Sequence, residues 1–140
     1  MIRRYFILLA EDNPGDVYLV KEAFREHGLD AEFRAVEDGE KAIDFLVEAA
    51  GGSSAAIPDL LLLDVNLPKR TGHEVLEILR RTTELQDVPV ILLSSSESPS
   101  DKLQAEELGV SAWFHKATTL EEFLKLGAVA KSILAPSAGS

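Results

Sequence analysis

Short apolar runs along the chain alternate with longer segments in which apolar residues recur every three or four positions. The first pattern predicts β-strands and the second predicts amphipathic helices. Two of the short runs, Leu60–Leu63 and Val88–Leu93, contain no polar side chain. Strands buried on both faces of a parallel sheet have this composition, so we expect these two to be central. The predicted strands are Tyr5–Ala10, Ala31–Val36, Leu60–Leu63, Val88–Leu93 and Ser111–His115.

The helical segments are bounded by residues that favour helix ends. Asn13 is a typical N-cap before Pro14 in the first helical position, and Gly28 ends that helix. Thr119 caps the last helix, and Glu122 three residues later completes a predicted capping box. The predicted helices span residues 14–27, 39–49, 72–82, 98–108 and 120–134.

Five strands that alternate with five helices predict an α/β fold, in which a doubly wound parallel sheet carries helices on both faces. We expect residues 1–135 to form one domain, because 140 residues are enough for a single core. The glycine- and serine-rich stretch at 50–56 is expected to be a surface loop, and residues 136–140 a disordered tail. No output domain is predicted.

The composition removes several classes of function. The chain has no cysteine, which excludes disulfides, thiolate catalysis and cysteine-bound metals. Its net charge of −10 repels phosphate backbones, so we expect no nucleic-acid partner. The apolar runs are far shorter than the ~20 residues needed to span a bilayer, and no signal peptide is recognisable. We therefore expect a cytoplasmic protein without membrane contacts.

Polar residues follow four of the predicted strands, at the sheet edge where folds of this kind bind their ligands. Carboxylates crowded at one edge repel one another unless a cation lies between them, and hard oxygen ligands suit Mg²⁺. With Mg²⁺ bound, Asp64 can attack phosphorus, while Ser94 and Lys116 hold the phosphoryl oxygens. The pattern predicts a magnesium-dependent acyl-phosphate site. Its residues are Glu11 and Asp12 after the first strand, Asp64 after the third, Ser94 after the fourth and Lys116 after the fifth.

Each of these residues taken alone also has an ordinary structural explanation. An acidic pair after a strand is often a solvated turn, a single aspartate can cap the next turn, and Lys116 can face solvent. Their joint placement at four strand ends favours the functional interpretation. The histidines show no metal-ligand spacing and are expected to be structural or surface residues: His27, His73 and His115.

The motifs resemble the receiver domain of two-component response regulators over essentially the whole chain. They are Glu11-Asp12-Asn13, the segment Leu63–Pro68 followed by Gly72, and the single residues Ser94 and Lys116. The separations 94 − 64 = 30 and 116 − 94 = 22 are similar to those of the family. The segment Glu11–Val20 most resembles the single-domain receivers that accompany bacterial phytochrome histidine kinases.

This resemblance implies the flavodoxin-like strand order 2-1-3-4-5 and a role for each matching residue. Asp64 would accept a phosphoryl group from a sensor histidine kinase, with bacterial phytochrome kinases as the candidates. Output would pass through contacts with a downstream phosphotransfer or effector protein. The chain would catalyse only its own phosphorylation and dephosphorylation. Mg²⁺ would be held by Glu11, Asp12, Asp64 and the backbone carbonyl of Asn66; Ser94 and Lys116 would bind phosphoryl oxygens; Ser94 and Trp113 would act as the switch.

Three residues depart from the pattern of the family. Ala117 stands where the family has a proline, which follows the lysine and forms a cis bond. A cis bond before a residue other than proline costs ~2.5–4 kcal/mol, so a trans bond with an altered loop and a cis bond are both open here, and the placement of Lys116 depends on which one forms. Trp113 is bulkier than the usual tyrosine or phenylalanine, so we expect a sluggish or partial switch. Ser95 replaces a small residue, often alanine, and should leave Asp64 accessible.

Four other functions fit the residues less well than that of a phosphorylated receiver. A haloacid-dehalogenase-like phosphatase also uses a strand-end aspartate, with a second aspartate two residues later as general acid. This chain has Asn66 at that second position, and asparagine cannot act as a general acid. A pseudo-receiver that works without phosphorylation is disfavoured by the intact acidic residues. The chain also lacks the glycine-rich phosphate-binding loop that a flavin-binding module or a P-loop protein would need.

The last two predicted helices differ in their apolar content. Residues 120–134 carry an apolar arc, including Leu126, Val129 and Ile133, that is wider than one sheet face needs. This arc predicts a protein interface, for which a homodimer is the candidate. Residues 98–108 are only weakly apolar, and we expect a solvent-exposed or mobile helix there.

Overall fold

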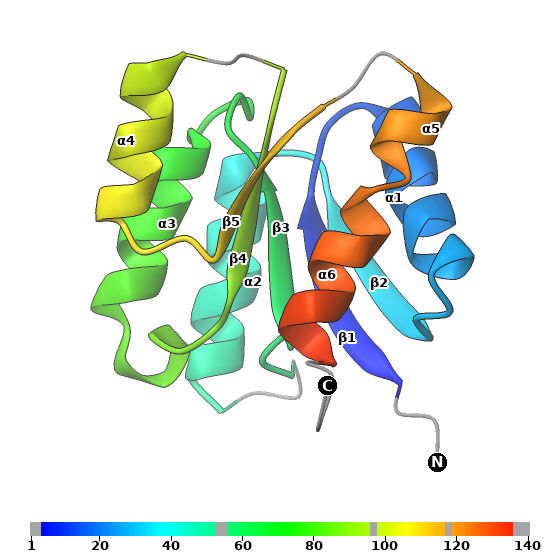
Figure 1. The fold of residues 1–140 in the computed structure, drawn as a ribbon. Coiled ribbons are helices and arrows are strands. Elements are labelled where there is room, and N and C mark those ends of the chain that lie inside the picture. The colour runs from blue at the N-terminus through cyan, green and yellow to red at the C-terminus, as the bar shows by residue number, and fades with distance from the viewer. Residues whose placement is uncertain (1–3, 53–55, 96–97, 117–118, 136–140) are drawn as a thin grey trace.

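The computed structural model describes residues 4–52, 56–95, 98–116 and 119–135. They form a five-stranded parallel sheet with the order β2-β1-β3-β4-β5, which confirms the predicted fold (Figure 1). The tail at 136–140 and the peptide bond between Lys116 and Ala117 lie outside the described residues. The strands are β1 (Tyr5–Ala10), β2 (Ala31–Val36), β3 (Leu60–Asp64), β4 (Val90–Ser94) and β5 (Ala112–His115).

The helices cover both faces of the sheet, as predicted. Helices α2, α3 and α4 lie on one side, and α1, α5 and α6 lie on the other (Figure 1). Part of the connection between α3 and β4 is a short 3₁₀ helix, η1 (Thr83–Leu85). The α-helices are α1 (Pro14–Glu26), α2 (Gly39–Ala50), α3 (Gly72–Arg81), α4 (Pro99–Glu107), α5 (Leu120–Phe123) and α6 (Leu126–Leu134).

Strands β3 and β4 are buried at every residue, which confirms that they are central. Their side chains alternate between two hydrophobic clusters. Leu61 and Leu63 pack with α2 and α3, whereas Leu60 and Leu62 pack with α1 and α6. Because both faces of these strands are covered, an uninterrupted apolar run is the sequence that this position requires.

The predicted cap of the first helix is present. The side chain of Asn13 accepts hydrogen bonds from the backbone amides of Gly15 at 2.8 Å and Asp16 at 3.2 Å. At the start of α5, the Thr119 hydroxyl accepts from the Glu122 amide at 3.3 Å, which is one half of the predicted capping box. The Glu122 carboxylate is paired with Lys125.

The prediction of one continuous last helix is wrong, because the chain forms α5 and α6 with a break at Leu124 and Lys125. Nε2 of His27, at the end of α1, donates to the Leu124 carbonyl at 3.1 Å. The Gly127 amide bonds to that carbonyl three residues back, which tightens the turn. A Cβ at Gly127 would lie 2.2 Å from the Ala23 carbonyl oxygen, so close contact with α1 shapes this break.

The strand at Val88–Leu93 begins two residues later than predicted. The Val88 amide bonds to the Leu85 carbonyl in the turn after η1, so it is not available to the sheet. Pro89 has no amide hydrogen, although its carbonyl accepts from Leu61. The apolar composition of residues 88 and 89 therefore made them look like part of the strand.

The structure bears differently on the predictions made for residues 98–108 and 120–134. Ala105 is the one buried residue of α4 and the Leu103 side chain is exposed, in agreement with the prediction of a solvent-exposed helix. In the last helices, Val129 and Ile133 are half-buried and pack against the core. Leu120 stays exposed, and the predicted homodimer remains a prediction.

No helix in the described part of the chain is long and apolar enough to cross a membrane.

Candidate functional site

Glu11, Asp12 and Asp64 come together at the carboxyl edge of the sheet. Asp64 is the last residue of β3, and the other two directly follow β1, the neighbouring strand. One carboxylate oxygen from each residue lies within 4.8 Å of the other two. Asp12 is exposed, whereas Glu11 and Asp64 are buried, so the group opens to solvent on one side only.

The ammonium group of Lys116 lies among carboxylates, at the end of β5. Its Nζ is 2.6 Å from Oε1 of Glu11 and 2.9 Å from Oδ2 of Asp64. A third carboxylate belongs to Asp16 in the first turn of α1, whose Oδ2 is 3.0 Å from the same nitrogen. The lysine therefore reaches the site although the next residue is alanine rather than proline.

Asp16 is absent from the set of residues predicted from the sequence. Helix α1 begins at Pro14, and its first turn places Asp16 beside the carboxyl edge of the sheet. An acidic residue in the first turn of a helix is common, because it complements the helix dipole, so its type carries no specific signal. Asp16 lies four residues after Asp12 in the sequence. Its contact with Lys116 becomes evident only once the first turn of α1 is in place.

Burial and neighbouring charges shift two pKa values at this site. The pKa of Glu11 is raised to about 7, first by burial and further by the negative charge of Asp64, against the opposing effect of Lys116. Burial alone would lower the pKa of Lys116, but Glu11, Asp64 and Asp16 together raise it above the ordinary lysine value. Lys116 is therefore charged at neutral pH, whereas Glu11 titrates near neutrality.

The backbone around Asp64 is held on two sides. The Asn66 amide donates to Oδ1 of Asp64 at 2.9 Å, and the Val65 amide donates to Leu93 of β4 at 3.0 Å. A Cβ at Gly72 would lie 2.7 Å from the Asp64 carbonyl oxygen, so a glycine is needed where α3 begins. The family resemblance implies that the Asn66 carbonyl binds the metal, whereas the Asn66 amide is the group that contacts Asp64.

The remaining predicted residues lie on β4 and β5. Ser94 is buried at the end of β4, and its carbonyl accepts from the Lys116 amide at 2.7 Å. Ser95, the next residue, is exposed. Trp113 is half-buried and packs against the cluster beneath α2, α3 and α4.

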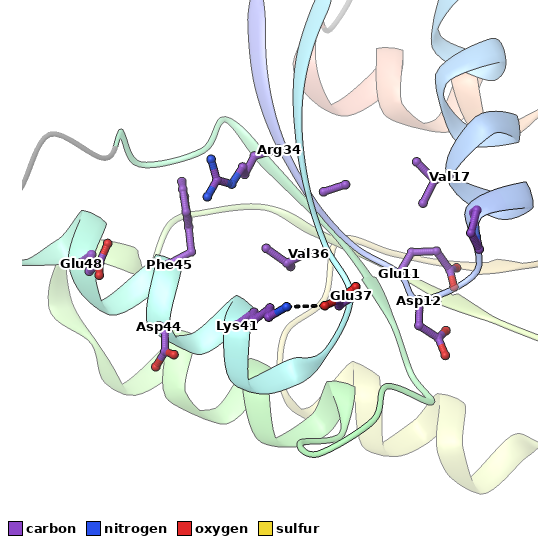
Figure 2. Close-up of a pocket in the computed structure, with 12 residues that line it drawn as sticks. Glu11, Asp12, Val17, Arg34, Val36, Glu37, Lys41, Asp44, Phe45 and Glu48 are labelled. Atoms are coloured by element: carbon purple, nitrogen blue, oxygen red, sulfur yellow. Dashed lines mark hydrogen bonds and ion pairs between the residues drawn. The ribbon is translucent and has the colours of Figure 1, made fainter.

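A groove of about 710 Å³ leads away from the acidic residues between β2 and α2. Figure 2 shows Glu11 and Asp12 at one end and Arg34 with Phe45 at the other. Lys41 in the groove forms an ion pair with Glu37. The groove gives solvent a path to the exposed side of the carboxylate cluster.

The donor set fits a hard divalent cation. Three carboxylates supply oxygen ligands, and Asp12 is open to solvent, which suits an ion such as Mg²⁺ that retains several waters. Lys116 supplies one positive charge against the buried pair Glu11 and Asp64, so the cluster is not neutralised by protein groups alone. A bound cation would supply the remaining positive charge.

No histidine belongs to the candidate metal group found among the described residues. His27 bonds to Leu124, His115 is exposed on β5, and His73 is half-buried in α3. No group of histidines with ligand geometry occurs among the described residues, since the candidate metal group contains carboxylates alone. Their placement agrees with the prediction that they are structural or surface residues.

Comparisons with known proteins give concordant results. A family model described as the response regulator receiver domain matches residues 7–127. Response regulator Rcp1 of Synechocystis sp. is 34% identical over 120 residues, which cover 86% of this chain and 82% of Rcp1. A probable methanogenesis regulatory protein, FilR2 of Methanothrix harundinacea, is 35% identical over 118 residues, which cover 84% of this chain and 76% of FilR2.

Solved structures show the same likeness. The phosphorylated cyanobacterial phytochrome response regulator RcpA has a TM-score of 0.87 and 31% identity, over 96% of this chain and 97% of RcpA. The Mn²⁺-bound form of Rcp1 has a TM-score of 0.81 and 32% identity, over 95% of this chain and 96% of that one.

Proposed function

Because the chain belongs to the response regulator receiver family, we propose that it accepts a phosphoryl group on Asp64 and signals through contacts with other proteins. The observation that carries the proposal is the environment of Asp64. Its Oδ2 lies 2.9 Å from a lysine ammonium, and oxygens of Glu11 and Asp12 lie within 4.8 Å. This is the charge distribution that a carboxylate needs to receive a phosphoryl group.

The proposed donor is a phosphohistidine of a sensor histidine kinase. An oxygen of Asp64 attacks phosphorus, the new O–P bond forms as the P–N bond breaks, and the imidazole nitrogen takes up a proton. Relatives that include phytochrome response regulators support a phytochrome-type kinase as the partner.

Each residue of the site has a proposed role. Glu11, Asp12, Asp64 and the carbonyl of Asn66 would hold Mg²⁺, which supplies positive charge for the transferred phosphoryl group. Lys116 and the Ser94 hydroxyl would bind phosphoryl oxygens. Trp113, which packs beneath α2, α3 and α4, would change its environment when Ser94 moves toward the new group.

Intact-mass spectrometry tests the proposal. The purified chain is incubated with acetyl phosphate and Mg²⁺, and we expect a phosphoryl adduct that is lost with chelator and in Asp64→Asn. Asp44→Asn, which changes an exposed carboxylate of the groove, is the matched control and should keep the adduct. Absence of any adduct, or an adduct that persists in Asp64→Asn, refutes the assignment and favours a receiver that works without phosphorylation.

A further inference from the structure

The carboxylate of Asp16 lies outside the acidic group that can hold a metal, yet it touches the same lysine. Its Oδ2 is 3.0 Å from Nζ of Lys116. The candidate metal ligands are the carboxylates of Glu11, Asp12 and Asp64. We propose that Asp16 is a positioning residue that anchors the Lys116 ammonium for phosphoryl transfer. This inference rests on the proposed function of Asp64 and assigns a role to a residue on a different element.

Three carboxylates surround the ammonium group of the lysine. Lys116 donates hydrogen bonds to Asp64 at 2.9 Å and to Asp16 at 3.0 Å, and its third close contact is the ion pair with Glu11 at 2.6 Å. The Lys116 side chain is 13% exposed and that of Asp16 is 23% exposed, so water competes less for this pair than for a surface ion pair. The ammonium is therefore held from three directions.

The three partners are not equivalent once the site is loaded. Glu11 and Asp64 belong to the group that would share its charge with a cation, and Asp64 would also carry the phosphoryl group. Both then attract the lysine less strongly than they do in the metal-free protein. Asp16 keeps its full charge and its contact, so it is the partner that can hold Lys116 while one N–H turns to a phosphoryl oxygen.

The start of α1 fixes the position of Asp16. The Asp16 amide donates to the side chain of Asn13 at 3.2 Å, and Pro14 occupies the first helical position. A capped, proline-initiated turn has few alternative conformations, so the carboxylate is presented to Lys116 from a rigid element. The Asn13-Pro14-Gly15-Asp16 segment thus connects the helix start to the phosphorylation site.

Two variants separate positioning from charge. Asp16→Asn and Asp16→Ala both remove the negative charge, but asparagine keeps an oxygen that can accept from Lys116. We expect phosphorylation by acetyl phosphate to be about tenfold faster in Asp16→Asn than in Asp16→Ala, because only the asparagine still orients the ammonium. Asp44→Ala controls for the loss of a nearby exposed carboxylate and should match the wild type.

Chemical labelling of Lys116 gives a second measurement that does not depend on phosphorylation. The full chain is treated with an amine-reactive ester, and labelling is read by peptide mass spectrometry, with exposed Lys131 as the internal reference. We expect Lys116 to be labelled about tenfold faster in Asp16→Ala than in the wild type, with Asp16→Asn in between. Thermal unfolding of each variant establishes that it is folded.

The outcomes distinguish this inference from the proposed function. Equal labelling of Lys116 in all three proteins, or equal phosphorylation of the asparagine and alanine variants, overturns the positioning role. A wild-type chain that forms no adduct refutes phosphorylation of Asp64, while the labelling result still decides whether Asp16 anchors the lysine.

Discussion

Nζ of Lys116 lies 2.9 Å from Oδ2 of Asp64, although 52 residues separate them in the chain. The contact joins the ends of β5 and β3, which are themselves separated by β4 in the sheet. A side chain as long as that of lysine can cross this interval. The pair places one positive charge beside the carboxylate that is proposed to accept the phosphoryl group.

Removing the lysine should destabilise the metal-free protein. In Lys116→Met, the buried Glu11 and Asp64 lose their common cation, and we expect a loss of about 3 kcal/mol in the free energy of unfolding at pH 8. Lys131→Met, on the exposed side of α6, is the control and should change stability by less than about 0.5 kcal/mol. Urea unfolding measures both.

Addition of Mg²⁺ should restore part of that stability, since a cation that binds the folded carboxylates stabilises the native state. The variant should also bind Mg²⁺ more tightly than the wild type, because no ammonium competes for the oxygens. A Lys116→Met protein that is as stable as the wild type without metal would contradict a buried, charged site.

Glu11 should give the metal-free protein a distinctive dependence on pH. Its pKa is raised from 4.5 to about 7, chiefly by burial, so the folded chain binds this proton more tightly than the unfolded chain. The stability that the proton contributes is fully present below about pH 4.5 and is lost as pH rises to about 7.

Glu11→Gln isolates this contribution, because glutamine does not titrate. We expect the free energy of unfolding of the wild type to fall, relative to that of the variant, as the pH is raised from 4.5 to 7. Mg²⁺ binding by the wild type should weaken as pH is lowered below 7, because the proton competes with the metal. Parallel pH profiles for the two proteins would show that Glu11 has an ordinary pKa.

Arg80 should be the residue that anchors α4. From α3, its guanidinium donates to the carbonyls of Leu108 at 3.2 Å and Gly109 at 2.9 Å, directly after α4. It also donates to Gln86 at 2.8 Å and Val88 at 3.1 Å in the turn before β4. Few apolar contacts hold this helix, since Ala105 is its one buried residue, so these hydrogen bonds carry more weight than usual.

We expect Arg80→Ala to lower the free energy of unfolding by about 2 kcal/mol and to accelerate amide exchange selectively in Pro99–Glu107. The neighbouring Arg81→Ala is a matched control, because that side chain is 75% exposed and forms a surface ion pair with Glu77. Uniform acceleration across the chain would show that Arg80 contributes to global stability rather than to α4.

Gly127 should tolerate no side chain. A Cβ there would lie 2.2 Å from the Ala23 carbonyl oxygen and 2.3 Å from Cδ2 of His27, so α6 would have to move away from α1. We expect Gly127→Ala to cost about 2–3 kcal/mol in urea unfolding. Gly51→Ala is the control, since its nearest neighbour would be 3.4 Å away, and a neutral Gly127→Ala would disprove the tight contact.

The sequence by itself determined the order of elements and most of the site. Unbroken apolar runs identified β3 and β4 as central, because strands covered on both faces have no solvent-facing positions. Asn13 and Pro14 located the start of α1 because capping is decided by neighbouring residues. Strand ends located Glu11, Asp12, Asp64 and Lys116, since parallel strands bring their carboxyl ends to one edge.

The tertiary structure alone decided the break between α5 and α6 and the part played by Asp16. The break depends on the approach of Gly127 and Leu124 to α1, a contact between segments about 100 residues apart. Asp16 matters because a helix turn and the end of β5 meet in space, and the type of this residue is ordinary for a helix start. Local patterns report local preferences, whereas long-range contacts decide which acidic side chain meets which lysine.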